Sequence, residues 1–334
     1  MRARLVTAAK IALGLALIAW LLGSVDWGEL AALARAGDPA QLALSVGAFV
    51  VAMAAFQALR LHVLVRRYTG SLSRSYKLFF VGALFNNLLP SNVGGDAVRL
   101  LYLRRMGDGG WGGPLSLLMV HRLSGIAVLL VAGAVYVLLR AQRLLWLTGR
   151  GALSVGVHPT VAVALAAGAV AVAAFALLAL TKEALRARLR ALVDSSGRAL
   201  GALTAADWVG LLLLTVAFHA ARLVGLWWAA AYFGEAVDAF DLVFVLAVTA
   251  IVALLPISIA GLGVVEGSIS FLLVAFGVGQ TAAISAALIN RAVLLLMALA
   301  GAVVYIGARD ELSANVAGGP GAAAQGESGG GSRV

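Results

Sequence analysis

Apolar runs long enough to cross a bilayer constrain this chain more than any other feature. A transmembrane helix needs about 20 consecutive, mostly apolar residues. Hydrophobic residues make up 62% of the chain and charged residues only 12%, against roughly 45–50% and 25% in soluble domains. The sequence therefore predicts an all-α polytopic membrane protein. Its full-length spans are expected at about 5–25, 41–63, 113–139, 160–180, 207–232 and 280–308.

Two further apolar segments are interrupted by proline. One covers residues 76–103 with Pro90 near its middle, and the other covers residues 240–278 with Pro256 near its middle. Their arms are short, and apolar runs of about 10–14 residues are more typical of re-entrant segments than of spanning helices. We predict six spanning helices and two re-entrant hairpins, with eight full spans as the alternative.

The basic residues indicate the orientation. If each hairpin returns to the side from which it enters, 17 of the 25 Lys and Arg residues fall on one side. An excess of basic residues marks the cytoplasmic side, so both termini are expected in the cytoplasm and the protein in the cytoplasmic (inner) membrane. The basic residues flank apolar spans without interleaved aromatic residues. The net charge of +10 therefore indicates contact with the lipid bilayer and not with nucleic acid.

A single transmembrane domain is predicted over residues 1–311. Within it, segment 182–206 has leucines on one helical face and basic residues on the other, which predicts a helix on the cytoplasmic membrane surface. Residues 312–334 are rich in glycine, which predicts a disordered tail.

Four stretches recur in the same order in the two halves of the chain, about 5–139 and 160–308. The pairs are FQALRL (56–61) with FHAARL (218–223), YKLFF (76–80) with FDLVF (240–244), LLPSNVGGD (88–96) with LLPISIAGLG (254–263), and VHRLSGIAVLLVAGAVYV (120–137) with INRAVLLLMALAGAVVYI (289–306). Each half would hold three spans and one hairpin, so an odd number of membrane crossings separates equivalent positions. Equivalent positions in the two halves therefore face opposite sides of the membrane. Paired Pro/Gly-interrupted segments in such an inverted repeat indicate a transporter site at the midplane.

The first hairpin has the features of an anion site. Pro90 lacks an N–H and ends the first arm, and Gly94 and Gly95 allow a turn that exposes backbone N–H groups. The second arm begins near Asp96, and the start of a helix attracts anions. The second hairpin repeats these features with Pro256, Gly261 and Gly263.

Charged residues inside the apolar segments carry an excess of positive charge. Four arginines and two carboxylates leave a net charge of +2; they are Arg99, Arg122, Arg222, Arg291, Asp96 and Glu266. Each central charge costs about 2.5–3.5 kcal/mol on insertion scales, so four arginines indicate a function. A guanidinium group suits phosphate recognition.

Structural roles are the alternatives for part of this set. Asp96 would cap its helix, and Arg99 would form an ion pair with Asp96 or extend to the cytoplasmic membrane interface. Arg222 would form an ion pair with Glu266. Arg122 and Arg291 occupy equivalent repeat positions inside their spans, which favours a shared clamp on phosphate. The predicted substrate-binding set is Asn86, Asn87, Pro90, Gly94, Gly95, Asp96, Arg99, Arg122, Arg222, Pro256, Gly261, Gly263, Glu266, Asn290 and Arg291.

At NNLLPSNVGGDAVR (86–99), HRLSG (121–125) and LPISIAGLGVVEG (255–267), the sequence resembles the flippase-like membrane region of lysylphosphatidylglycerol synthases. The resemblance covers about residues 5–310 and implies movement of a lipid with an anionic or aminoacylated headgroup between leaflets. It also implies that the aminoacyltransferase activity of such synthases belongs to a fused domain that this sequence lacks. The chain departs from the family pattern at His121, where an acidic residue is usual, and at Val265, where a basic residue is usual. We infer that these charges would pair across the halves, so that their joint loss preserves neutrality.

The leading hypothesis is a lipid translocase without enzymatic activity, cofactor or metal. Its substrate would be an anionic or aminoacylated phospholipid or a polyprenyl-phosphate-linked lipid, held through its phosphate headgroup. The alternatives are a membrane glycosyltransferase and a non-catalytic scaffold for envelope lipid or glycan synthesis. An envelope-synthesis enzyme or a second copy of the chain is the expected protein partner.

Overall fold

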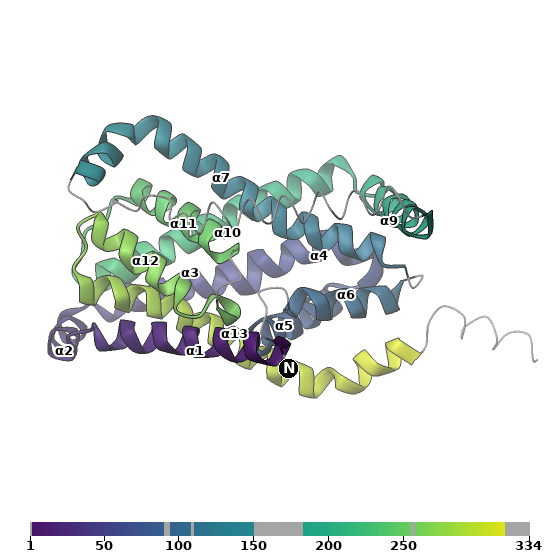
Figure 1. The fold of residues 1–334 in the computed structure, drawn as a ribbon, viewed down its shortest axis with the longest axis horizontal. Helices are drawn as coiled ribbons and strands as arrows, with labels where there is room; N and C mark the ends of the chain where they lie inside the picture. Colours follow the sequence, from purple (N-terminus) through teal and green to yellow (C-terminus); the bar gives the residue numbers. More distant parts are fainter. Residues whose placement is uncertain (1, 90–93, 108–109, 150–182, 255–257, 318–334) are drawn as a thin grey trace, which may run out of the picture.

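The fold is known from a computed structural model that describes residues 2–89, 94–107, 110–149, 183–254 and 258–317. All regular structure in these ranges is helical (Figure 1). The elements are α1 (Arg2–Gly23), α2 (Trp27–Ala36), α3 (Pro39–Val50), η1 (Val51–Gln57), α4 (Ala58–Thr69), α5 (Leu72–Leu88), α6 (Gly94–Met106), α7 (Gly112–Gly149), α9 (Glu183–Gly201), α10 (Ala205–Tyr232), α11 (Ala239–Leu254), η2 (Ile259–Gly261), α12 (Val264–Ala275) and α13 (Gln280–Ala317).

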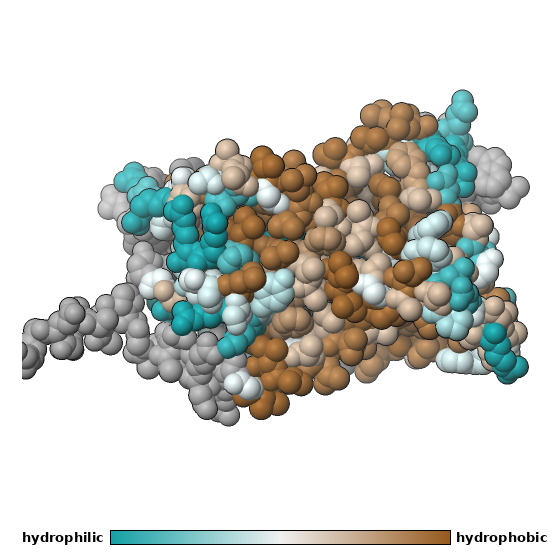
Figure 2. Space-filling model, turned by 180° about the vertical axis from the view of Figure 1, so that it is seen from behind, coloured by the Kyte–Doolittle hydropathy of each residue, from teal (hydrophilic) through white to brown (hydrophobic). Residues whose placement is uncertain are grey.

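Four of the predicted spans are confirmed as helices long and apolar enough to cross a membrane. They are Pro39–Thr69, Gly112–Arg140, Ala205–Tyr232 and Gln280–Gly307. The face of the molecule seen in Figure 2 agrees with this, because hydrophobic residues cover its middle and hydrophilic residues gather at its two ends. The molecule is thus a multi-pass membrane protein. The span predicted at 160–180 lies outside the described residues.

The first predicted span ends in a bend. Helices α1 and α2 meet at an angle of 71°, because Asp26 between them caps α2 by accepting hydrogen bonds from the N–H groups of Gly28 and Glu29. The pair forms a fifth candidate span only if its two helices are counted together.

Two long helices form the spine of the bundle: the continuous α3–η1–α4 segment and α10, which pack along one another. Ser45 ties them by donating a hydrogen bond to the Gly225 carbonyl at 2.7 Å. A Cβ atom at Gly225 would lie 2.9 Å from the ring of Phe49, so glycine permits this close approach. The spine contains a π-helical segment, η1, and such insertions are frequent at functional sites.

Each proline-interrupted segment forms two short helices that pack on one another. The first hairpin consists of α5 and α6, and the second of α11 and α12 joined through η2. The hairpins lie in opposite halves of the bundle's long axis (Figure 1), and α5 touches η2 where they meet. The breaks at 90–93 and 255–257 lie outside the described residues, and with them Pro90 and Pro256.

The amphipathic segment forms α9, which packs on α7. Helix α13 continues without a break to Ala317, beyond the domain boundary predicted at residue 311. The remainder of the predicted tail, 318–334, is outside the described residues.

Candidate functional site

Two adjoining cavities occupy the middle of the bundle. The first, here called the hairpin chamber, has a volume of about 260 Å³ and lies between Asn86 and Asn87 of α5 and Ala260 and Gly261 of η2. The second, the spine chamber, has a volume of about 290 Å³. It is lined by α4, α7 and α10 through Arg60, His121, Phe218, His219 and Arg222. The chambers share the lining residues Gln57, Asn86, Arg99, Arg122 and Ala253.

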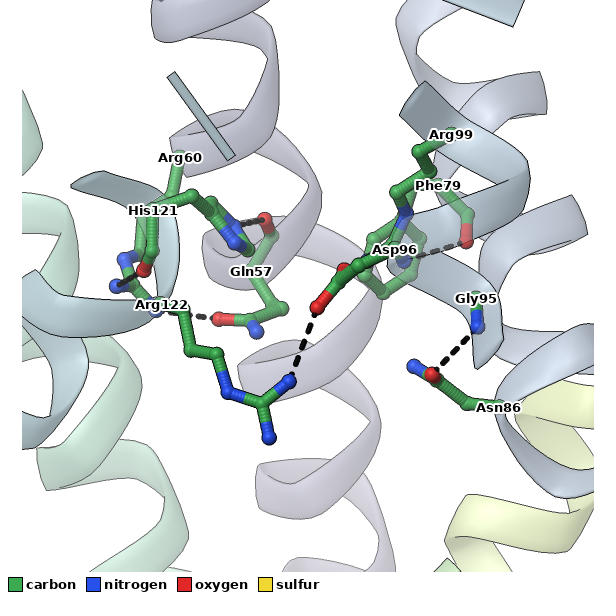
Figure 3. Close-up of polar contacts among 9 residues, drawn as sticks. All are labelled: Gln57, Arg60, Phe79, Asn86, Gly95, Asp96, Arg99, His121 and Arg122. Atoms are coloured by element: carbon green, nitrogen blue, oxygen red, sulfur yellow. Dashed lines mark hydrogen bonds and ion pairs between the residues drawn. The ribbon is translucent and has the colours of Figure 1, made fainter. Parts of the chain in front are cut away.

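Asp96 joins the first hairpin to α7 (Figure 3). One carboxylate oxygen accepts a hydrogen bond from Arg99 at 2.8 Å and the other from Arg122 at 3.2 Å. The carboxylate therefore holds two arginines from different helices. The interpretation that Arg99 pairs with Asp96 is confirmed, and the guanidinium also donates to the Phe79 carbonyl at 3.0 Å.

Glu266 plays the corresponding part in the second hairpin. Its side chain is completely buried and accepts a hydrogen bond from Arg291 Nε at 2.5 Å. Its other oxygen accepts the N–H of Gly263 at 2.7 Å. The suggestion that Glu266 pairs with Arg222 is wrong, because Arg291 occupies that carboxylate.

The two ion pairs are built in the same way. Asp96 is the third residue of α6 and Glu266 is the third residue of α12. Each pairs with an arginine on the next long helix, Arg122 on α7 or Arg291 on α13. A carboxylate in the first turn of a helix also meets its positive dipole end, so each acid is stabilised by both its helix and its arginine.

The predicted exposure of glycine N–H groups is not found at two positions. The N–H of Gly95 donates to the Asn86 side chain at 2.8 Å, and the N–H of Gly263 is taken by Glu266. Gly95 instead permits close packing, since a Cβ there would lie 2.0 Å from the Gly82 carbonyl oxygen. Gly263 packs on α1, where its Cβ would lie 2.4 Å from Leu17 Cβ.

The remaining predicted residues divide between the cavity and the core. Gly261 lines the hairpin chamber with φ of +68°, and Asn87 lines it while donating to the Ala83 carbonyl at 3.0 Å. Gly94 is buried, and a Cβ there would lie 2.5 Å from Leu89 Cβ. Asn290 is buried and is not among the lining residues of either chamber.

Arg60 is a site residue that the predicted substrate-binding set does not include. It is 1% exposed, it lies on α4 inside the spine, and it lines the spine chamber. Its guanidinium donates to Gln57 Oε1 at 2.5 Å, to the His121 carbonyl at 2.8 Å and to Ser124 Oγ at 2.9 Å. The repeat already contained the signal, because FQALRL aligns Arg60 with Arg222.

The charge of the site is strongly positive. Five arginines line the two chambers, namely Arg60, Arg99, Arg122, Arg222 and Arg291. Two carboxylates of the described residues, Asp96 and Glu266, form ion pairs with members of this set. Counted over these described residues, the site has three more positive charges than negative ones. Among the described residues no cluster of His, Asp and Glu could hold a metal ion. The arrangement is suited to binding an anion.

His121 and Val265, the two positions that depart from the family pattern, line different chambers. His121 faces the spine chamber and Val265 the hairpin chamber. A direct pairing of charges at these positions stays a prediction.

Comparison with known proteins gives one match. The model of a family described as the lysylphosphatidylglycerol synthase TM region matches residues 7–301, in agreement with the resemblance of the hairpin motifs. No curated protein and no solved structure matches the chain.

Proposed function

The chain belongs to the lysylphosphatidylglycerol synthase TM-region family, and on this premise we propose that it is a lipid translocase. It binds the phosphate headgroup of a membrane lipid in the two chambers and moves that lipid between leaflets of the cytoplasmic membrane. The substrate class is an anionic or aminoacylated phospholipid or a polyprenyl-phosphate-linked lipid.

One observation carries this proposal: among the described residues, the arginines around a cavity in the apolar middle of a membrane protein exceed the carboxylates by three. A charge at that depth is expensive and usually marks a substrate path. An anionic headgroup would lower this cost by supplying the missing negative charge. The acyl chains of the same lipid would remain in contact with the apolar outer surface.

The pattern of helix contacts supports an inverted repeat. The first half contributes α4, α5, α6 and α7, and the equivalent helices of the second half are α10, α11, α12 and α13. When equivalent helices are exchanged, the α5–α6 contact becomes α11–α12 and the α6–α7 contact becomes α12–α13. The contact between α7 and α11 becomes the one between α13 and α5, and all of these contacts are present. Alternating access in such folds comes from one repeat rocking against the other around a fixed site. We assign the fixed site to the chambers, and both termini to the cytoplasm.

The residues have different roles in this proposal. Arg122 is the clamp, because its side chain is 27% exposed and lines both chambers. Arg291 is held in place by its ion pair with Glu266 and lines the hairpin chamber with a fixed guanidinium group. Asp96 restrains Arg122 until a headgroup phosphate competes for the guanidinium.

The test is reconstitution of the full chain into liposomes with fluorescent lipids, where a membrane-impermeant quencher bleaches only the outer leaflet. Wild-type protein should raise the bleached fraction above one half for at least one phosphate-bearing lipid. Arg122→Gln should abolish the gain, and Arg190→Gln, a matched change at an exposed residue of α9, should keep it. Identical bleaching of protein-free and wild-type vesicles for every headgroup would remove the translocase function.

A further inference from the structure

Arg60 and Arg222 flank one aromatic ring in the spine chamber. The guanidinium carbons lie 5.4 Å and 5.7 Å from the centre of the Phe218 ring. The two arginines come from the two spine helices, α4 and α10, and they are equivalent in the repeat. Neither forms an ion pair within the described part of the chain, because the carboxylates of this region, Asp96 and Glu266, are held by other arginines.

Residues of the same chamber carry two buried polar atoms without a hydrogen-bond partner among the described residues, Arg60 Nε and His219 Nδ1. His219 Nε2 donates its N–H to the Gly125 carbonyl at 3.0 Å, so Nδ1 of the neutral ring is an acceptor and only Arg60 Nε is a donor. Buried polar atoms are nearly always satisfied, so the unpaired Arg60 donor adds to the demand for an acceptor at this chamber.

Arg60 is also held rigidly. Its terminal nitrogens bond to a side-chain amide, a main-chain carbonyl and a hydroxyl, none of which carries a charge. These bonds fix the guanidinium without neutralising it. The spine chamber therefore has a positive potential that exists before any ligand arrives, and such preorganisation lowers the cost of binding.

We propose that the spine chamber is a subsite for a terminal phosphate dianion, which rests on the proposed function and specifies its substrate class. A phosphomonoester carries a charge of about −1.5 to −2 at neutral pH and three acceptor oxygens. This charge matches the two guanidinium groups at Phe218. Arg222 contacts the phosphate, and Arg60 adds a fixed charge behind it.

Other headgroups match the chamber less well. A phosphodiester has a single negative charge and would leave one of these guanidinium groups uncompensated. An aminoacyl headgroup would place an ammonium group beside an excess of arginines. The two carboxylates of the site, Asp96 and Glu266, are already paired with arginines and so are not available to the ammonium group. The expected preference is therefore for phosphatidic acid or a polyprenyl monophosphate or diphosphate over phosphatidylglycerol and its lysyl ester.

The experiment measures binding of four probes to the purified full chain in phosphatidylcholine nanodiscs: phosphatidic acid, phosphatidylglycerol, lysyl-phosphatidylglycerol and inorganic phosphate. Phosphatidic acid should bind at least about tenfold more tightly than phosphatidylglycerol, a difference of about 1.4 kcal/mol. Because a phosphomonoester gains its second charge with a pKa of about 6, this preference should increase from about pH 5 to about pH 7.5. Binding of phosphatidylglycerol should change little over that range.

Variants locate the subsite. Arg222→Gln should lose most of the preference for phosphatidic acid, while the exposed control Arg190→Gln should keep it. Equal binding of phosphatidic acid and phosphatidylglycerol, tighter binding of the lysyl ester, or full preference in Arg222→Gln would overturn the dianion subsite. The pH series needs only wild-type protein, so it decides the matter even if a variant fails to fold.

The outcome separates this inference from the proposed function. Equal binding and transport of both anionic lipids would keep the translocase and remove the subsite. Binding of inorganic phosphate as tightly as phosphatidic acid, without transport of any lipid, would support the dianion site and assign it to free phosphate.

Discussion

The two ion pairs at the hairpins should respond differently to loss of their arginine. Glu266 has no solvent exposure, and in Arg291→Met it would keep only the Gly263 N–H as a partner. Removing one member of a buried ion pair typically costs about 3–5 kcal/mol, because the other charge stays buried alone. We therefore expect Arg291→Met to lower the free energy of unfolding by roughly 3–5 kcal/mol.

Arg122→Met is the matched comparison. Asp96 would keep its bond to Arg99 at 2.8 Å, and Arg122 itself is 27% exposed. The loss of a partly exposed ion pair costs about 1 kcal/mol or less. The equivalent arginines of the repeat thus differ by several kcal/mol in their contribution to stability, and Arg122 is the better variant for separating binding from folding.

The assay is unfolding by sodium dodecyl sulfate in mixed micelles, followed by tryptophan fluorescence. Adding Glu266→Gln to Arg291→Met should restore most of the lost stability, because no charge then remains buried without a partner. The reasoning fails if Arg291→Met is no less stable than Arg122→Met, or if the double variant is as unstable as the single one.

Two further predictions follow from packing and topology. Gly95→Val should prevent stable folding of the first hairpin, because its Cβ would lie 2.0 Å from the Gly82 carbonyl oxygen. Gly267→Ala is the control and should behave as wild type, because nothing lies within 4 Å of the new atom. Equal yields of folded monomer for the two variants by size-exclusion chromatography would contradict this prediction. The chain has no cysteine, so Gly70→Cys should react with an impermeant maleimide from the cytoplasm and Ala236→Cys from outside, and reaction of both from one side would refute the inverted topology.

Hydropathy predicted four of the six expected spans, because a bilayer demands long apolar helices whatever their partners. The two hairpins were predicted from the positions of Pro90 and Pro256, which fall in the middle of apolar segments. Hydropathy could not predict the bend after α1. That bend depends on a single capping carboxylate, Asp26, which directly follows the span predicted at 5–25.

The site was predicted less completely, for a physical reason. Arg60 lies near the end of the span predicted at 41–63 and was not included in the predicted site, yet α4 continues to Thr69 and Arg60 is buried within it. The sequence VAMAAFQ of η1 contains no recognisable signal for a π-helix, although this segment ends at Gln57, the residue that holds the Arg60 guanidinium. Exposure of the glycine N–H groups was predicted wrongly for Gly95, since its nearest acceptor is a side chain of its own hairpin.

The location of the excess of three positive charges around the chambers has an electrical consequence. Moving one elementary charge across a membrane potential of 100 mV involves about 2.3 kcal/mol. The chambers stay fixed while the repeats rock, so this excess does not cross the field, and the charge that moves is that of the headgroup, about −1.5 to −2 for a phosphomonoester. A potential that is negative inside would therefore oppose inward movement of the headgroup and favour outward movement, and transport in liposomes should respond to a potassium diffusion potential.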